Sequence, residues 1–152
     1  MEMLPTIIFV PGAWHTTSHT QPLIATLTNR NHKALCLQLA SVGLKSPRPT
    51  FEDDVRLITQ SCLAEMEHGR NVLLVLHSMA GMCGAEAVNR IIAAGGLEKR
   101  QGKGGLVRVV LIAAYALPAG VVLDARDYVG PENPNLSIDV SEHGVSCRTR
   151  SS

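Results

Sequence analysis

Ser78 has the sequence surroundings of a nucleophile. It lies in "VLHSMAG" (75–81), between the apolar run 71–76 and a segment with helical periodicity at 79–94. A serine on a sharp strand-to-helix turn holds its hydroxyl at the edge of a sheet, and the helix N-terminus behind it favours a negatively charged intermediate. The chemistry that these residues suggest is nucleophilic attack by the Ser78 hydroxyl.

A second candidate region is the loop "VPGAWH" (10–15), which follows the apolar run "TIIFV". Gly12 and Ala13 leave backbone N–H groups free to point inward. Trp14 and His15 are candidates, with Gly12, for the lining of a substrate pocket. Both this loop and Ser78 follow the carboxyl end of a predicted strand, which is where open parallel sheets bind their ligands.

The elements that must position these groups alternate between strands and helices. Apolar runs indicate buried strands, and crossovers of the observed length between them require the strands to be parallel. The sequence therefore predicts an α/β domain over residues 1–117, with a parallel sheet of about four strands and flanking helices. The predicted strands are 6–10, 34–40, 71–76 and 106–117, and the predicted helices begin near Thr20, after a capping box of Thr50 and Asp53, and at Met79.

Beyond residue 117 this regular pattern ends. Residues 118–152 contain prolines and glycines and have no sustained hydrophobic period, so they are expected to form an irregular tail. Only residues 121–128 have a weak helical pattern.

Together the Ser78 turn and the 10–15 loop resemble the α/β-hydrolase family, and in particular its small esterase and hydroxynitrile-lyase-like members, which open with a "V-x-G-A" loop. The resemblance covers roughly residues 4–120, as the N-terminal portion of such a domain. It implies that Ser78 is the nucleophile and that the N–H groups of Met79 and Ala13 form an oxyanion hole. The implied substrate is a small ester or a related acyl compound.

The sequence departs from the Gly-x-Ser-x-Gly pattern of that family, because Leu76 and Ala80 replace its two glycines. Ala80 is nearly as small as glycine, whereas Leu76 needs space against a neighbouring element. Gly81 and Gly84 keep the face of the following helix open. We therefore expect a normal elbow, with strained backbone dihedrals at Ser78 and its hydroxyl facing the 11–15 loop.

A serine nucleophile needs a base, and the family places an acid and then a histidine on loops after later strands. Only about 35 residues follow the fourth predicted strand, too few for two more strands with their crossovers. The sequence is therefore expected to stop before the acid and the base. His77 is interpreted as structural, because side chains of adjacent strand residues point to opposite faces. His15 and His143 are candidate substitutes.

Two interpretations remain open. In the first, the chain is an esterase-like serine hydrolase acting through Ser78, with weak activity or none. In the second, it is a non-catalytic α/β-hydrolase-like chain that binds a small apolar ligand or a partner.

Composition excludes several other classes of function. The 152 residues carry a formal net charge of only +1, which does not favour nucleic acid or a membrane surface. The N-terminus has no signal-peptide pattern, so a soluble cytoplasmic protein is expected. No cofactor or metal is expected, because there is no phosphate-binding glycine loop and no metal-ligand spacing. The four cysteines, Cys36, Cys62, Cys83 and Cys147, are interpreted as free thiols.

The family's sheet order predicts the neighbours of each strand. It places the strands in the order 34–40, 6–10, 71–76 and 106–114, so the last of them becomes an apolar edge. An unpaired apolar edge is a template for association, so the chain is expected to be marginally stable and either to self-associate through this edge or to need a partner.

Overall fold

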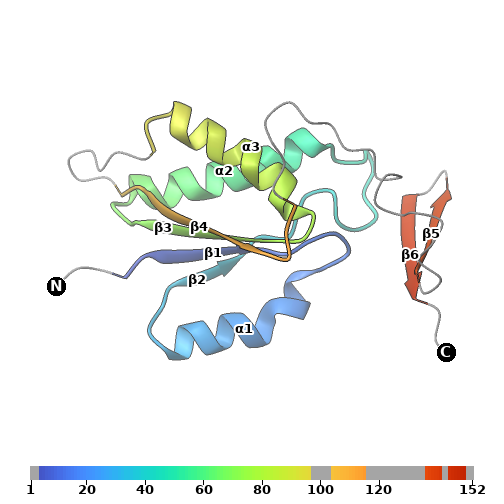
Figure 1. Cartoon of the computed structure of the whole chain (residues 1–152), viewed down its shortest axis with the longest axis horizontal. Helices are drawn as coiled ribbons and strands as arrows, with labels where there is room; N and C mark the ends of the chain where they lie inside the picture. Colours follow the sequence, from blue (N-terminus) through green and yellow to red (C-terminus); the bar gives the residue numbers. More distant parts are fainter. Residues whose placement is uncertain (1–3, 97–103, 116–135, 142–143, 150–152) are drawn as a thin grey trace. The chain divides into compact units, whose positions relative to one another are not determined.

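The computed structural model describes residues 4–96, 104–115, 136–141 and 144–149 of the chain (Figure 1). It divides into two compact units, Met1–Leu117 and Pro118–Ser152. Each unit is treated separately below.

The first unit contains a four-stranded sheet in the order β2-β1-β3-β4, with every neighbouring pair parallel. This confirms the predicted fold class and the predicted strand order. Along the chain, the elements are β1 (Thr6–Val10), α1 (Thr17–Asn29), β2 (Ala34–Cys36), α2 (Phe51–Glu67), β3 (Val72–His77), α3 (Ala80–Ala93) and β4 (Leu106–Ile112).

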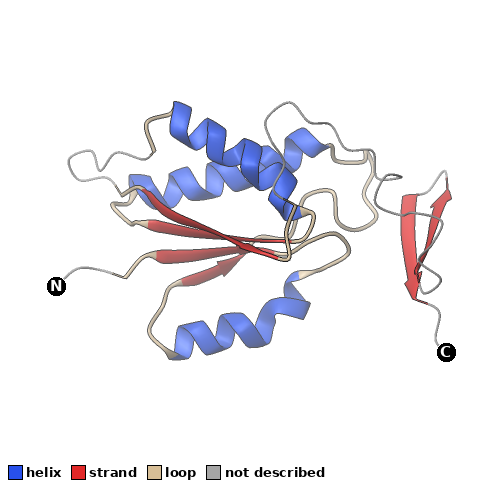
Figure 2. Ribbon diagram, viewed as in Figure 1, coloured by secondary structure: helices blue, strands red, loops and turns tan. Residues whose placement is uncertain are grey.

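Helices cover both faces of this sheet: α2 and α3 lie on one face and α1 on the other (Figures 1 and 2). The larger core is on the α2–α3 face, where Ile8, Leu74 and Ile58 are completely buried. The smaller core is on the α1 face and is built on Ile7, Phe9 and Val75. The alternation of β1 and β3 side chains between two cores explains why both strands are almost entirely apolar.

Three elements differ in extent from the sequence prediction. The fourth strand, predicted to reach residue 117, ends at Ile112. The second strand ends at Cys36 rather than at residue 40. Leu39 is nevertheless completely buried in the larger core, so the apolar pattern of 34–40 reports burial rather than strand pairing. Helix α1 begins at Thr17, because Thr16 caps it: the Thr16 N–H donates to His19 Nδ1 at 3.1 Å.

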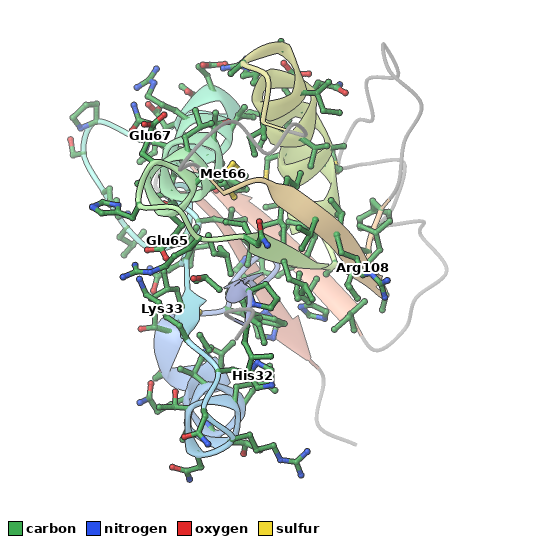
Figure 3. All side chains as sticks on the ribbon, turned by 90° about the vertical axis from the view of Figure 1, so that its left-hand side faces the viewer. His32, Lys33, Glu65, Met66, Glu67 and Arg108 are labelled. Carbon is green, nitrogen blue, oxygen red and sulfur yellow. The ribbon has the colours of Figure 1, made fainter. Side chains whose placement is uncertain are left out.

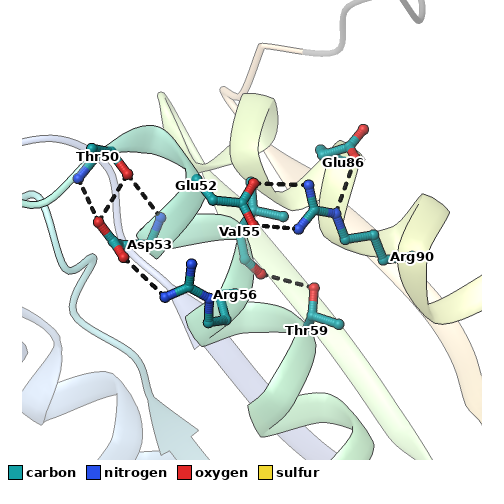
Figure 4. A network of polar contacts seen from close by, with 8 residues as sticks. All are labelled: Thr50, Glu52, Asp53, Val55, Arg56, Thr59, Glu86 and Arg90. Carbon is teal, nitrogen blue, oxygen red and sulfur yellow. Dashed lines mark hydrogen bonds and ion pairs between the residues drawn. The ribbon is translucent and has the colours of Figure 1, made fainter.

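Polar side chains fix the ends of α2. The predicted capping box is present, with the Thr50 N–H donating to Asp53 Oδ2 at 2.8 Å (Figure 4). Arg90 on α3 holds both carboxylate oxygens of Glu52, at 2.6 and 2.9 Å, and so ties the two helices together. At the other end of α2, Glu65 accepts from Lys33, at 2.7 Å from one carboxylate oxygen and 2.8 Å from the other (Figure 3).

Strand β4 pairs with β3 alone among the described strands. Large side chains along it remain in solvent, since Val107, Leu111 and Ile112 are 46–49% exposed. The exposed apolar edge predicted from the sequence is therefore present in the described part of the chain.

The second unit contains an antiparallel pair of strands, β5 (Leu136–Ser141) and β6 (Gly144–Thr149). The sequence analysis expected irregular chain here. Apolar and polar residues alternate along "LSIDVS", which is typical of a strand, but the prolines and glycines that precede it led to the prediction of irregular chain. The helix candidate 121–128 and His143 lie outside the described residues.

None of the described helices combines the length and the apolar character that crossing a bilayer would require.

Candidate active site

Ser78 occupies the turn between the end of β3 at His77 and the start of α3 at Ala80. Its φ of 54° is in the left-handed region, which costs a non-glycine residue about 1–3 kcal/mol and persists only where the surroundings enforce it. Backbone hydrogen bonds supply that enforcement. The Ser78 N–H donates to Ile112 O at 3.3 Å, and the Ser78 carbonyl accepts from Gly81 and Tyr115 at 3.1 and 3.2 Å. The geometry agrees with the predicted elbow.

The loop after β1 lies directly against Ser78. A Cβ atom added to Gly12 would come within 2.7 Å of Ser78 Cβ and 3.1 Å of Ser78 Oγ. No side chain other than hydrogen fits that spacing without a shift of the backbone, so glycine at position 12 permits the approach. The structure therefore brings together Gly12 and Ser78, as the sequence analysis expected.

A tight turn shapes this loop. The His15 N–H donates to Gly12 O at 3.3 Å, and Trp14, the third residue of the turn, has a φ of 62°. That position normally belongs to glycine or asparagine in a type II turn. The Trp14 side chain is 50% exposed. Its strained backbone belongs to the loop that Gly12 brings against Ser78, and strained residues concentrate at functional sites.

Three histidine side chains meet at this loop. The Gly12 N–H donates to His77 Nδ1 at 3.3 Å, and His15 Nδ1 lies 2.8 Å from Ala13 O. The His15 ring meets the His77 ring edge-on, with centroids 5.5 Å apart, and the His19 ring at 5.4 Å. Sequence analysis missed this contact between His77 and the loop, and no signal could have found it, because the residues are 65 positions apart.

Two backbone donors beside Ser78 are unused. Among the residues that the structure describes, the N–H groups of Ala13 and Met79 donate to no other group. Met79 is the N-cap of α3, where the positive end of the helix dipole adds to its N–H. Free N–H groups at such a position suit a developing oxyanion.

Leu76, which replaces the first glycine of the elbow pattern, is accommodated by α3. It is 1% exposed, and a Cβ atom on Gly84 would overlap its Cδ1 atom. A Cβ atom on Gly81 would likewise overlap the carbonyl oxygen of Tyr115, so no side chain fits at that position. The space that the family obtains from a glycine before the serine is thus obtained here from Gly84.

Two buried thiols in the described part of the chain do not compete with Ser78 as nucleophiles. Burial raises the pKa of the Cys62 and Cys83 thiols to about 12, so both are protonated and unreactive near neutral pH. Within the described ranges, no group of three or more histidine, cysteine or acidic side chains could hold a metal ion.

Among the described residues, no base of a catalytic triad is bonded to Ser78. In the part of the chain that the structure describes, no histidine accepts a hydrogen bond from the Ser78 hydroxyl. His15 remains the candidate in the loop. Because the Ala13 carbonyl oxygen can only accept, His15 Nδ1 donates to it, and Nε2 of the neutral ring then carries no proton.

A hollow of about 260 Å³ lies on the α3 side of β4. Gly12, Trp14, His15 and Ser78 are not among the residues that line it. Its walls are mostly apolar and come from β3, β4 and α3: Leu76, Gly81, Ala85, Val88, Asn89, Val109 and Leu111.

Comparison with known proteins gives the same picture as the geometry. The model of the family described as "Alpha/beta hydrolase family" matches residues 7–145. The chain is also 33% identical over 125 residues to the alpha/beta hydrolase nvfD of Aspergillus novofumigatus (strain IBT 16806). That alignment covers 80% of this chain and 48% of the relative, so the chain spans about half the length of nvfD. The strained serine between β3 and α3, the glycine loop against it and these matches establish that the chain belongs to the α/β-hydrolase family.

Proposed function

We propose that Ser78 is the nucleophile of an esterase-like serine hydrolase that acts on a small ester or a related acyl substrate. The observation that carries this proposal is the strained Ser78 backbone held against the Gly12 loop. The esterase and hydroxynitrile-lyase-like branch is part of the same proposal, because its members share the "V-x-G-A" loop.

The proposed reaction follows from the groups around Ser78. Its Oγ attacks the substrate carbonyl carbon, gives its proton to a solvent water and forms a tetrahedral intermediate. Solvent water returns a proton to the leaving oxygen when this intermediate collapses. The negative oxygen of this intermediate is stabilised by the N–H groups of Ala13 and Met79. Collapse expels the alcohol and leaves an acyl-serine, which water then hydrolyses. Gly12, Trp14 and His15 line the pocket in this proposal.

We further propose that this chain by itself turns over esters slowly. A serine hydroxyl is a weak nucleophile without a base, and in the described residues none is bonded to Ser78. An oxyanion hole and substrate binding alone can still give about 10³-fold over the reaction in water.

The test combines covalent labelling with turnover. A fluorophosphonate probe should label the wild-type chain slowly at Ser78, as shown by peptide mass spectrometry, and should not label Ser78→Ala. Ser61→Ala, on α2, is the matched control and should label as wild type does. Hydrolysis of p-nitrophenyl butyrate should fall only slightly in Ser78→Ala.

Two outcomes would contradict these proposals. Absence of label at Ser78 under forcing conditions would exclude it as a nucleophile. A robust esterase rate that Ser78→Ala abolishes would mean that a base operates, and His15 and His143 would then be replaced first.

A second candidate function is binding without catalysis. The apolar hollow between α3 and β4 favours it, because Ser78 does not line that hollow and its lining is mainly aliphatic. This function would be supported over the first if an apolar fluorescent ligand bound the wild type and Ser78→Ala equally but did not bind Val88→Trp.

A further inference from the structure

We propose that His77 is a positioning residue: its imidazole ties the Gly12–Ala13 loop to the elbow and thereby aims the Ala13 N–H at the oxyanion. This inference rests on the proposed function for its purpose, but the tie itself can be tested without any activity. It differs from the sequence-based interpretation, which gave His77 only a structural role.

The first argument is the direction of the hydrogen bond. The Gly12 N–H can only donate, so His77 Nδ1 must accept, and the neutral ring therefore carries its proton on Nε2. His77 is the last residue of β3 and precedes Ser78 in the chain. The bond therefore joins the loop to the residue beside the nucleophile, across 65 positions of sequence.

The second argument is the allocation of the loop's donors. Gly12 and Ala13 carry successive N–H groups, and His77 uses that of Gly12. The Ala13 N–H has no acceptor among the described groups, so of these two donors it is the one left for a substrate oxygen. By accepting from the Gly12 N–H, His77 Nδ1 thus leaves the Ala13 N–H as the donor for the substrate oxygen.

The third argument is the packing of the rings. The His77 and His15 rings meet at 88° with centroids 5.5 Å apart, and His15 Nδ1 donates to Ala13 O at 2.8 Å. One histidine therefore holds the Gly12 amide and the other holds the Ala13 carbonyl. Between them the orientation of the intervening peptide is fixed, which is the requirement for a preorganised oxyanion donor.

The matched variants are His77→Leu, which removes the acceptor, and His77→Asn, whose side-chain oxygen can take the place of Nδ1. His68→Leu, on an exposed histidine that follows α2, is the control. We expect the Gly12 amide to exchange with solvent about tenfold faster in His77→Leu than in wild type, as measured by NMR. Exchange should return most of the way to the wild-type rate in His77→Asn and remain unchanged in His68→Leu.

The same variants carry the functional readout. Fluorophosphonate labelling of Ser78 should slow by about tenfold or more in His77→Leu and recover in His77→Asn. If wild-type Ser78 does not label at all, the proposed function fails, while the exchange of the Gly12 amide still decides the role of His77.

A measurement on the wild-type chain guards against a variant that does not fold. Long-range ¹⁵N–¹H correlation spectra should show His77 as the tautomer protonated on Nε2. The proposal is overturned if Nδ1 carries the proton, if Gly12 exchange is the same in His77→Leu and wild type, or if His77→Asn behaves as His77→Leu does.

Discussion

Strands β3 and β4 are neighbours with similar sequences, "VLLVLH" and "LVRVVLI", but they lie in different environments. Along β3, Val72 and Leu74 are completely buried, because the strand has a partner on each side and helices on both faces. On β4, Val107 and Leu111 are nearly half exposed. Apolar composition alone therefore did not decide which strand is central.

The difference shows what it takes to hold a strained serine. Ser78 continues from the buried strand, and its N–H is fixed by Ile112 O at the end of β4. The edge of β4 that pairs with β3 thus also holds the Ser78 turn. The other edge of β4 pairs with no described strand. The strained Ser78 is therefore held by a hydrogen bond to β4, although the outer edge of β4 has no partner among the described strands.

The largest expected effect is on stability. Leu74→Ala should lower the free energy of unfolding by about 2–5 kcal/mol, because it leaves a cavity in a closed core. The same truncation at Leu111 should cost about 1 kcal/mol or less, since roughly half of that side chain is already in water. Urea unfolding followed by circular dichroism measures both. Equal losses at the two positions would show that another segment buries β4 in solution.

A second, intermediate effect concerns the space for Leu76. Gly84→Ala should destabilise the fold by about 1–3 kcal/mol, because its methyl group would overlap the Leu76 side chain. In a chain that already carries Leu76→Ala, Gly84→Ala should cost less than it does in the wild type, with a coupling of about 0.5–3 kcal/mol in a double-mutant cycle. Ala85→Val is the control, since Ala85 faces the hollow and has room. Additive losses would exclude the compensation between Leu76 and Gly84.

The smallest effect on stability is expected at the edge itself, where we propose that copies of the chain associate along β4. Val109→Lys should change the free energy of unfolding by only about 0.5 kcal/mol, because Val109 is 36% exposed. A lysine on an edge strand opposes pairing with another chain. Sedimentation velocity should therefore show concentration-dependent association of the wild type and less of it in Val109→Lys.

Leu23→Lys, on the exposed side of α1, is the control for this last experiment and should associate as the wild type does. A wild-type chain that stays monomeric at every concentration would refute association through β4.

Local patterns were enough to predict much of this molecule. The apolar runs gave the four strands of the first unit, and the Thr50–Asp53 pair gave the start of α2. Position 78 was recognised as an elbow because a strand signal, a serine and a helix signal follow one another directly. Such signals act within a few residues, so they can be found without knowing the fold.

Short or unusual signals were missed for the opposite reason. His19 takes the place that glutamate usually has in a capping box, so the start of α1 was placed three residues late. Leu39 is apolar because it packs in the core, and it was mistaken for part of a strand. The strands β5 and β6 were missed although apolar and polar residues alternate along them, because the prolines and glycines before them favoured a prediction of irregular chain.

What the sequence by itself determined is the alternation of elements, the order of strands through the family resemblance, and the candidate nucleophile. Only the tertiary structure decided that Gly84 makes room for Leu76, that Gly12 reaches Ser78, and that His77 accepts from Gly12. These three relations join residues from different elements. Their existence depends on distances and free volumes of a few ångströms, which arise only when the elements pack, and no spacing along the chain encodes them.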